Sequence, residues 1–339
     1  MNIQIPIIIV SIFLTLMIGV SGSAQAQDSS NSKQQSIEIT EWAVPWEETR
    51  PRDPDVAADG SVWFVGQIGD YVGHFVPETE DFSKVDLPDG SGPHNVIVGG
   101  DGMLWIAGNK QAYVGRMNPK NGALQRFPTA EPQVKDPHTL VWSDDDKIWF
   151  TAQWGNTINR LDPESGKVNT VEVSTEEARP YGIILRENLP WVVLFGTNKL
   201  ATVDSNMRLR EIELPRADAR PRRIGKTSDG RIWYVDYNQG YLGVYDVDSG
   251  EFLEWRAPGA DKSGPYAMAV DGADRIWFVE TFQSPNRLIG FDPKTETFFS
   301  QTDIPSGGGS VRHMVFDAPR NALWFGTDTN NLARAELPQ

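Results

Sequence analysis

Apolar and polar residues alternate with a period of two over many short stretches between residues 37 and 339. One example is the segment GPHNVIV at residues 92–98. Alternation of this kind predicts strands, because successive side chains of a strand point to opposite faces of the sheet. No long stretch follows the 3.6-residue period of an amphipathic helix. The pattern therefore predicts an all-β protein.

A tryptophan marks a repeating unit along the chain. Of the 12 tryptophans, seven recur at intervals of 42 to 47 residues: Trp63, Trp105, Trp149, Trp191, Trp233, Trp277 and Trp324. Each unit reads as four short strands, with Asp-Gly turns before several tryptophan strands and Asn-Pro or Asp-Pro turns after several third strands. Four strands in 40 to 45 residues is the period of a β-propeller, in which a large flat ring fills the wedge between neighbouring sheets. We expect seven blades of four strands each.

The seventh unit lacks its fourth strand, and the start of the chain supplies a candidate. Residues 310–339 end after a third strand, whereas ITEWAVP at 39–45 resembles FLEWRAP at 252–258, the predicted outer strand of unit five. An N-terminal strand that completes blade seven would close the ring and remove its open edges. Residues 37–339 are therefore predicted to form a single seven-bladed domain.

The first 26 residues carry no charged side chain and end in Ala-Gln-Ala, which is typical of a signal peptide and its cleavage site. An uncleaved membrane anchor is the alternative, although the apolar run is short for a full span. Residues 27–36 are polar and serine-rich, so we expect a disordered mature N-terminus. The prediction is an exported protein, periplasmic or secreted, with no membrane span once the signal is removed.

Composition narrows the function. Hydrophobic residues at 39% and charged residues at 23% are typical of a soluble globular protein, and we expect a monomer. The formal net charge of −15 argues against nucleic acid or an anionic membrane as a partner. There is no cysteine, which excludes disulfides, thiolate metal sites and cysteine nucleophiles.

Candidate chemistry gathers where the first strand of each blade begins, because these strands line the channel of a propeller. The residues that we expect to open them, in a ring around the channel mouth, are Asp55, His94, His138, Tyr181, Arg222, Tyr266 and His313. Three of the four histidines belong to this ring. Imidazoles beside a carboxylate suit metal binding or general base catalysis, whereas an arginine and two tyrosines suit an anionic or carbonyl-bearing ligand. A purely structural role for the ring stays open.

Two carboxylates just beyond the tryptophan strands form a second predicted layer. They are Glu280 in unit six and Asp328 in unit seven. A carboxylate near a channel is costly unless it is paired or bound to a cation. Both are candidates for the site, although either could simply cap the end of a strand.

The repeat resembles the virginiamycin B lyase (streptogramin lyase) family of seven-bladed propellers, from about Ile37 to Leu337. The resemblance rests on an iterated pattern that appears as Gly92-Pro93-His94, Asp101-Gly102-Met103-Leu104-Trp105 and Val114-Gly115-Arg116-Met117-Asn118-Pro119. It implies an enzyme that opens a cyclic depsipeptide by elimination across an ester, with Mg²⁺ and a histidine base.

Carried over to this chain, the resemblance places the catalytic histidine on His313 and the glutamate after the last Trp-Phe on Asp328. The metal-binding glutamate falls on Val311, which cannot bind a cation, and the histidine of the preceding blade falls on Tyr266. The Mg²⁺ site of the family is therefore in doubt. His94 and His138, together with Asp328, are the remaining candidates for holding Mg²⁺ or another divalent cation.

Three functions stay open at this point. The first is a lyase-like enzyme acting on an ester or lactone, with His313 and Asp328 as catalytic residues. The second is a non-catalytic propeller that binds a small molecule, glycan or protein at its mouth. The third is a metal-dependent lactonase. In each, the residues expected to contact a small ester, lactone or cyclic peptide are Asp55, Tyr181, Arg222, Tyr266 and Glu280.

Overall fold

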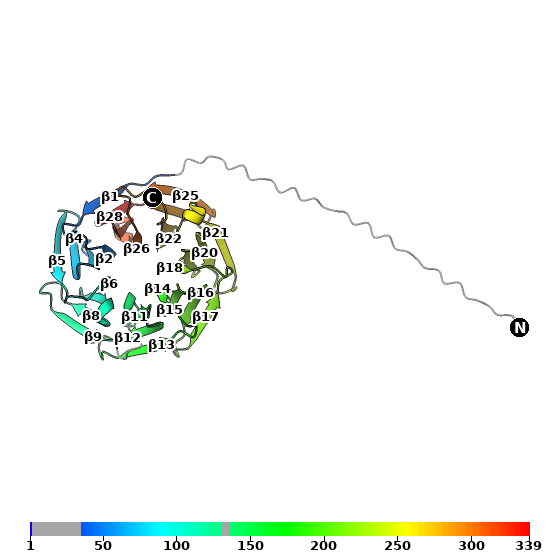
Figure 1. Cartoon of the computed structure of the whole chain (residues 1–339), viewed down its shortest axis with the longest axis horizontal. Coiled ribbons are helices and arrows are strands. Elements are labelled where there is room, and N and C mark those ends of the chain that lie inside the picture. The colour runs from blue at the N-terminus through cyan, green and yellow to red at the C-terminus, as the bar shows by residue number, and fades with distance from the viewer. Residues whose placement is uncertain (2–34, 130–135) are drawn as a thin grey trace. The chain divides into compact units, whose positions relative to one another are not determined.

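Seven antiparallel sheets of four strands surround a central channel in the computed structural model, as Figure 1 shows. The structure describes residue 1, residues 35–129 and residues 136–339. The all-β prediction and the blade count are confirmed. The predicted signal peptide and most of the polar segment after it lie outside the described residues and stay predictions. Within the described part, no helix is long and apolar enough to cross a membrane.

Blades one to three follow the chain in order, each running from an inner first strand to an outer fourth strand. Blade one consists of β2 (Pro51–Val56), β3 (Val62–Gly66), β4 (Tyr71–Val76) and β5 (Asp81–Asp86). Blade two consists of β6 (Pro93–Val98), β7 (Leu104–Gly108), β8 (Tyr113–Met117) and β9 (Leu124–Pro128). Blade three consists of β10 (Pro137–Trp142), β11 (Ile148–Ala152), β12 (Thr157–Leu161) and β13 (Val168–Glu172).

Blades four to six repeat this order. Blade four consists of β14 (Pro180–Arg186), β15 (Leu189–Leu194), β16 (Lys199–Val203) and β17 (Leu209–Glu213). Blade five consists of β18 (Pro221–Lys226), β19 (Ile232–Asp236), β20 (Tyr241–Tyr245) and β21 (Phe252–Arg256). Blade six consists of β22 (Pro265–Val270), β23 (Ile276–Glu280), β24 (Arg287–Asp292) and β25 (Thr297–Asp303). Among the described residues, three single-turn 3₁₀ helices lie between strands, at Asn109–Gln111, Ala260–Lys262 and Ala318–Arg320.

Blade seven joins the two ends of the described chain, as the sequence predicted. It contains β26 (Val311–Asp317), β27 (Ala322–Thr327) and β28 (Asn331–Glu336), and β1 (Ile39–Ala43) pairs antiparallel with β28 from Ile39↔Ala335 to Ala43↔Asn331. The amide side chain of Asn330 secures the crossing, donating to the carbonyls of Val44 (3.1 Å) and Trp46 (2.7 Å). The sheet of the last blade is thus completed by the first strand.

The hydrophobic core is divided into seven clusters, and six repeated tryptophans are buried between their own blade and the next. Trp149 of blade three, for example, packs with Ile183, Val192 and Leu194 of blade four and is 3% exposed. Each blade therefore buries its apolar face only against its neighbours, which is why the units cannot be stable singly.

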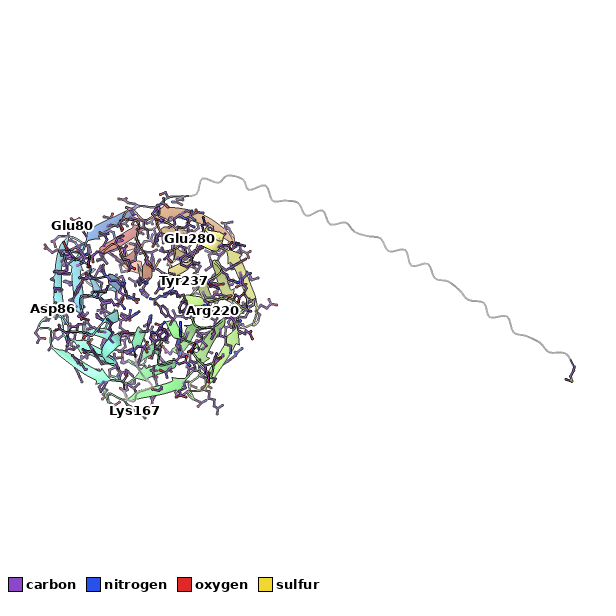
Figure 2. All side chains as sticks on the ribbon, viewed as in Figure 1. Glu80, Asp86, Lys167, Arg220, Tyr237 and Glu280 are labelled. Carbon is purple, nitrogen blue, oxygen red and sulfur yellow. The ribbon has the colours of Figure 1, made fainter. Side chains whose placement is uncertain are left out.

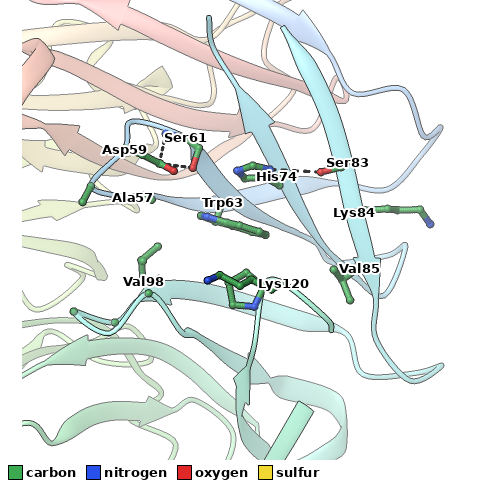
Figure 3. Close-up of a pocket in the computed structure, with 15 residues that line it drawn as sticks. Ala57, Asp59, Ser61, Trp63, His74, Ser83, Lys84, Val85, Val98 and Lys120 are labelled. Atoms are coloured by element: carbon green, nitrogen blue, oxygen red, sulfur yellow. Dashed lines mark hydrogen bonds between the residues drawn. The ribbon is translucent and has the colours of Figure 1, made fainter. Parts of the chain in front are cut away.

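Trp63 is the exception among the seven repeated tryptophans. It is partly buried, and its ring stacks on His74 with centroids 4.1 Å apart. Both rings line a cleft of about 570 Å³ between blades one and two, together with Lys84 and Lys120 (Figure 3). His74, the histidine outside the predicted ring, therefore belongs to the side of the propeller.

A bulge interrupts the first strand of every blade close to its start. In blade two, for example, Pro93 pairs with Gly108 and the next paired residues are Val96 and Ile106, so the register shifts between them. The other six first strands also shift by one residue near their start, although in blade one the shift follows Arg52, which still pairs with Val65. Because a bulge redirects the side chains within it, it affects the direction of the residues near the start of each first strand.

Candidate functional site at the channel mouth

Strand pairing defines which residues share one level of the channel. The opening residue of each first strand pairs with the last residue of the second strand, as in Pro51↔Gly66 and Val311↔Thr327. The residues that follow it form what we call the ring: Arg52, His94, His138, Tyr181, Arg222, Tyr266 and Arg312. Five of them were predicted from the sequence. Arg52 and Arg312 stand where we expected Asp55 and His313.

Asp55 lies three residues further along β2 than the ring position and pairs with Trp63. Its carboxylate accepts hydrogen bonds from the backbone N–H groups of Val98 (2.7 Å) and Val56 (3.0 Å). Burial raises the pKa of Asp55 to about 6, in spite of these bonds. Its hydrogen bond with Val98 therefore links blade one to blade two.

His313 lies one residue beyond Arg312 and lines a different space. It borders a cavity at the far end of the channel, where the first strands finish, together with Thr139 and Arg223. Burial and the Arg223 guanidinium lower the pKa of His313 to about 4, so its imidazole is neutral at pH 7. The structure therefore separates His313 from the ring histidines to which the sequence assigned it.

A layer of buried polar side chains crosses the channel at the level of the ring. We call it the plug, and its members are Arg52, Asp53, His94, His138, Tyr181, Arg223 and Tyr266, each at most 8% exposed. Arg223 of blade five spans it, donating to Asp53 of blade one (3.2 Å), to Thr139 of blade three (3.3 Å) and to the carbonyl of Arg312 in blade seven (2.9 Å). The plug thus ties distant blades together across the channel.

Asp53 is the carboxylate of the plug. Its two oxygens accept from Arg52 Nε at 2.8 Å and from Arg223 Nη2 at 3.2 Å. Burial alone would raise the pKa of Asp53, but the two guanidiniums hold it well below its usual range. Its backbone φ of 44° lies in the left-handed region, which aspartate tolerates better than most residues. Asp53 therefore stays ionised between two cations.

Imidazole and phenol rings continue the plug around blades two, three, four and six. The rings of His94 and His138 are 3.8 Å apart by centroid, those of His138 and Tyr181 are 3.9 Å apart, and the hydroxyls of Tyr181 and Tyr266 share a short hydrogen bond. Burial lowers the pKa of both histidines well below the usual value, and nearby guanidiniums lower it further. Both imidazoles are therefore neutral at pH 7.

Arg222 occupies a cage of aromatic rings at the mouth. Its guanidinium carbon lies 3.6 Å from the ring centroid of Tyr266, 4.1 Å from Tyr237 and 4.5 Å from Phe195. Its Nε is buried without a hydrogen-bond partner. Figure 2 shows Tyr237 close to the centre of the ring of blades. A cation stacked on aromatic faces is held by cation–π attraction, and the Nε of Arg222 still has an N–H without a partner among the described residues.

A second guanidinium pair lies beside this cage. Arg312 binds both carboxylate oxygens of Asp328, and Arg50 Nε approaches the same carboxylate at 3.8 Å. The side chains of Arg312 and Asp328 are 20% and 24% exposed. The guanidinium of Arg312 also lies 5.9 Å from the ring centroid of Tyr266. Arg222 and Arg312 both lie against Tyr266, and Arg312 pairs with the partly exposed carboxylate of Asp328.

Glu280 lies at the end of β23 and is fully buried. One carboxylate oxygen accepts from the backbone N–H of Gly259 at 2.5 Å, and the other accepts from Arg287 at 2.6 Å. One oxygen of Glu280 therefore binds the loop between blades five and six, and the other pairs with Arg287 at the start of β24. These contacts match the alternative that the sequence left open for Glu280, a carboxylate that caps a strand end.

The residues at the mouth do not fit a divalent cation. Among the described residues, no three histidine, aspartate or glutamate side chains gather closely enough to hold a metal ion. Asp328 is held by Arg312 and Arg50, and the Nε2 of His94 faces a guanidinium nitrogen of Arg52 at 3.2 Å. The predicted set of His94, His138 and Asp328 therefore does not form a cluster of three ligands. The guanidiniums of Arg50, Arg52 and Arg312 would repel a divalent cation at these positions.

Sequence reasoning missed the arginines Arg52, Arg223 and Arg312 and the aromatic residues Phe195 and Tyr237. The signal for Arg52 was present, since ring residues of blades two, three, five and six all lie 11 positions before the tryptophan of their blade, and Arg52 does too.

Blade seven breaks this spacing, because its first hairpin is one residue longer. Val315 pairs with Trp324, nine positions further on, whereas in blade two Ile97 pairs with Trp105, eight positions further on. The ring residue Arg312 therefore lies 12 positions before Trp324, and the usual count of 11 falls on His313. The spacing in the sequence favoured His313 for this reason.

Comparison with known proteins agrees with this fold. A family model described as the virginiamycin B lyase family matches residues 25–194, half of the chain. Among solved structures, virginiamycin B lyase from Staphylococcus aureus superposes with a TM-score of 0.81 at 20% identity, covering 89% of this chain and 100% of that chain. A catalytically inactive histidine-to-alanine form of that enzyme, solved with quinupristin, gives the same values.

More distant propellers also match. The extracellular domain of a protein described as a hybrid two component system from B. thetaiotaomicron has a TM-score of 0.67 at 13% identity, covering 89% of this chain and 43% of that chain. Among curated proteins, no sequence relative of this chain is found. Because the identities are 20% or lower, the solved structures support the fold assignment alone.

Proposed function

Because the chain belongs to the virginiamycin B lyase family, we propose that it is a lyase-like propeller whose mouth binds a small ester, lactone or cyclic peptide through a carboxylate or carbonyl oxygen. The observation that carries this proposal is the caged guanidinium of Arg222, whose Nε has no partner within the described residues. A buried donor without a partner is costly, and a ligand oxygen would satisfy it.

The surroundings of Arg222 favour a ligand that is both polar and apolar. Arg312 supplies a second guanidinium, whose Nε and Nη2 bind Asp328, so its Nη1 remains to donate to a ligand oxygen. Phe282 is 50% exposed and packs edge-on against Tyr237 with ring centroids 4.9 Å apart. An apolar ring or side chain of the ligand would gain burial against these two aromatic residues.

The accompanying reaction would be an elimination that opens the ester. A base takes a proton from the carbon that lies between a second carbonyl group and the ester-bearing carbon. The electron pair of that C–H bond forms a carbon–carbon double bond, and the C–O bond of the ester breaks so that the carboxylate departs. In this proposal Arg222 and Arg312 stabilise the negative charge that develops on the carbonyl oxygen, a role that needs preorganised donors rather than a metal ion. Asp328 is the accessible carboxylate beside them and is the proposed base.

The test uses a panel of carboxylate-bearing lactones and cyclic depsipeptides, quinupristin included, with binding measured by calorimetry and products by mass spectrometry. Arg222→Lys keeps the charge but loses the planar fork, and we expect at least a tenfold loss of affinity. Arg208→Lys, an exposed arginine on blade four, is the control and should bind as the wild type does. If Arg222→Lys binds every compound as well as wild type, the mouth site is wrong.

The reaction is tested separately from binding. Elimination in a ring leaves the mass unchanged, whereas hydrolysis adds one water. We expect Asp328→Asn to bind the ligand and to lose turnover, with turnover of the wild type insensitive to a chelator. Binding without turnover in the wild type would support a non-catalytic propeller. Loss of turnover with the chelator would support the metal-dependent alternative.

A further inference from the structure

The channel contains a cavity at the end opposite to the mouth. It has a volume of about 370 Å³, within the size range of small-molecule sites. Its walls come from the first strands of blades three to seven, and they are mostly apolar, with Ile184, Met268, Val270 and Val315 among them. The plug residue Arg223 and its hydrogen-bond partner Thr139 also line it, and both are buried.

The polar groups of this cavity are few and have a common character. They are Thr139, Arg223, Lys226 and His313, and no aspartate or glutamate is among the lining residues. This is unusual in a chain with a net charge of −15. Two cations in an otherwise apolar cavity favour an anion, since field lines are focused in a low-dielectric cleft.

Two of the polar groups have unused hydrogen-bonding capacity. The Nδ1 of His313 is buried without a partner. Arg223 has five N–H donors, of which the described contacts use three, to Asp53, Thr139 and the carbonyl of Arg312. A ligand oxygen at the inner end of the cavity could accept from both side chains.

We propose that this far-end cavity is a second binding site, for a small monocarboxylic acid with an apolar body. The carboxylate would lie between Arg223 and His313, and the body would contact Val270, Met268 and Val315. Lys226, exposed where β18 ends, would attract the anion to the opening. The cavity is distinct from the mouth, because none of Arg222, Arg312 and Asp328 is among its lining residues.

Benzoate is the probe for the test, with affinity measured by calorimetry. Val270→Trp fills the cavity, and Lys226→Glu reverses the charge at its opening without touching the core. We expect each to weaken benzoate binding at least tenfold. Arg312→Gln at the mouth is the control and should change the affinity less than twofold. Melting temperatures establish whether the variants are folded. If Val270→Trp does not fold, Lys226→Glu alone decides the test.

A second measurement locates the ligand directly. The imidazole nitrogen signals of the four histidines are recorded by NMR, with His313 assigned from His313→Gln. Benzoate should shift the His313 signal and leave His74 unchanged. No binding to wild type, or binding that Arg312→Gln abolishes and Lys226→Glu leaves intact, would overturn the proposal. The latter result would mean that benzoate binds at the mouth and that the far-end cavity holds only water.

Discussion

Burial differs between repeated positions that look the same in the sequence, and the tryptophans show it. Trp149 is surrounded by apolar side chains of two blades, whereas Trp63 has His74 on one face and a cleft beside it. Large-to-small substitutions cost most where the surrounding structure cannot collapse into the space. The stability contributed by one residue of the repeat therefore depends on its neighbouring blade.

We expect Trp149→Ala to lower the free energy of unfolding by about 3–5 kcal/mol and Trp63→Ala to lower it by about 1–2 kcal/mol. Urea unfolding followed by circular dichroism measures both. Equal losses in the two variants would mean that the cleft beside Trp63 does not persist in solution.

At the same scale, the ring shows what a sequence can and cannot reveal. His94, His138, Tyr181, Arg222 and Tyr266 were found because each follows a proline that opens its strand. Asp55 also follows a proline, Pro54, but it lies only eight positions before Trp63, whereas Arg52 lies eleven positions before it. His313 was a harder case, since only the backbone pairing of Val315 with Trp324 shows that its hairpin is longer. Contacts across the channel, such as Arg223 with Asp53, join residues 170 positions apart and leave no local pattern.

Among the elements, the strand β1 has a role that no other strand shares. It covers the edge of β28, and its Trp42 stacks on Trp324 with ring centroids 5.6 Å apart. This closure could be predicted because residues 39–45 resemble the outer strand of another blade. Without β1, unpaired backbone groups of β28 and apolar surface over blade seven would face solvent.

A chain that begins at residue 46 is therefore expected to melt at a markedly lower temperature and to self-associate. The matched control begins at residue 35 and keeps β1. Scanning fluorimetry and light scattering after gel filtration compare the two. Equal melting temperatures and monomeric elution of both would show that β1 does not stabilise the ring.

For the molecule as a whole, the histidines around the channel make the free energy of unfolding depend on pH. The pKa values of His94, His138 and His313 are all lowered in the folded protein, so the unfolded chain binds protons more readily as the pH falls below about 6.5. Each histidine therefore lowers the free energy of unfolding as the pH falls from the ordinary pKa of histidine towards its pKa in the folded protein. Asp55, whose pKa is raised to about 6, acts in the opposite direction.

We expect the free energy of unfolding of the wild type to fall between pH 7 and pH 4.5. In His313→Gln the fall should be smaller by about 2 kcal/mol, since the pKa of His313 in the folded state is about 4. Urea titrations at the two pH values give the difference. An identical fall in wild type and variant would show that His313 titrates normally and is not buried beside Arg223.

The pairing of β1 with β28 also bears on how the chain comes to be folded. During synthesis β1 must wait without its partner until residues 331–335 have been made, some 290 positions later. Six blades can assemble from neighbouring segments, but the seventh cannot, and long-range pairing of this kind is slow. The backbone N–H of Glu336 already donates to the carbonyl of Glu38 at 3.0 Å. A circular permutant that attaches residues 37–50 behind Gln339 through a short hairpin would make every blade contiguous, and the seventh would then be synthesised as one local unit like the rest.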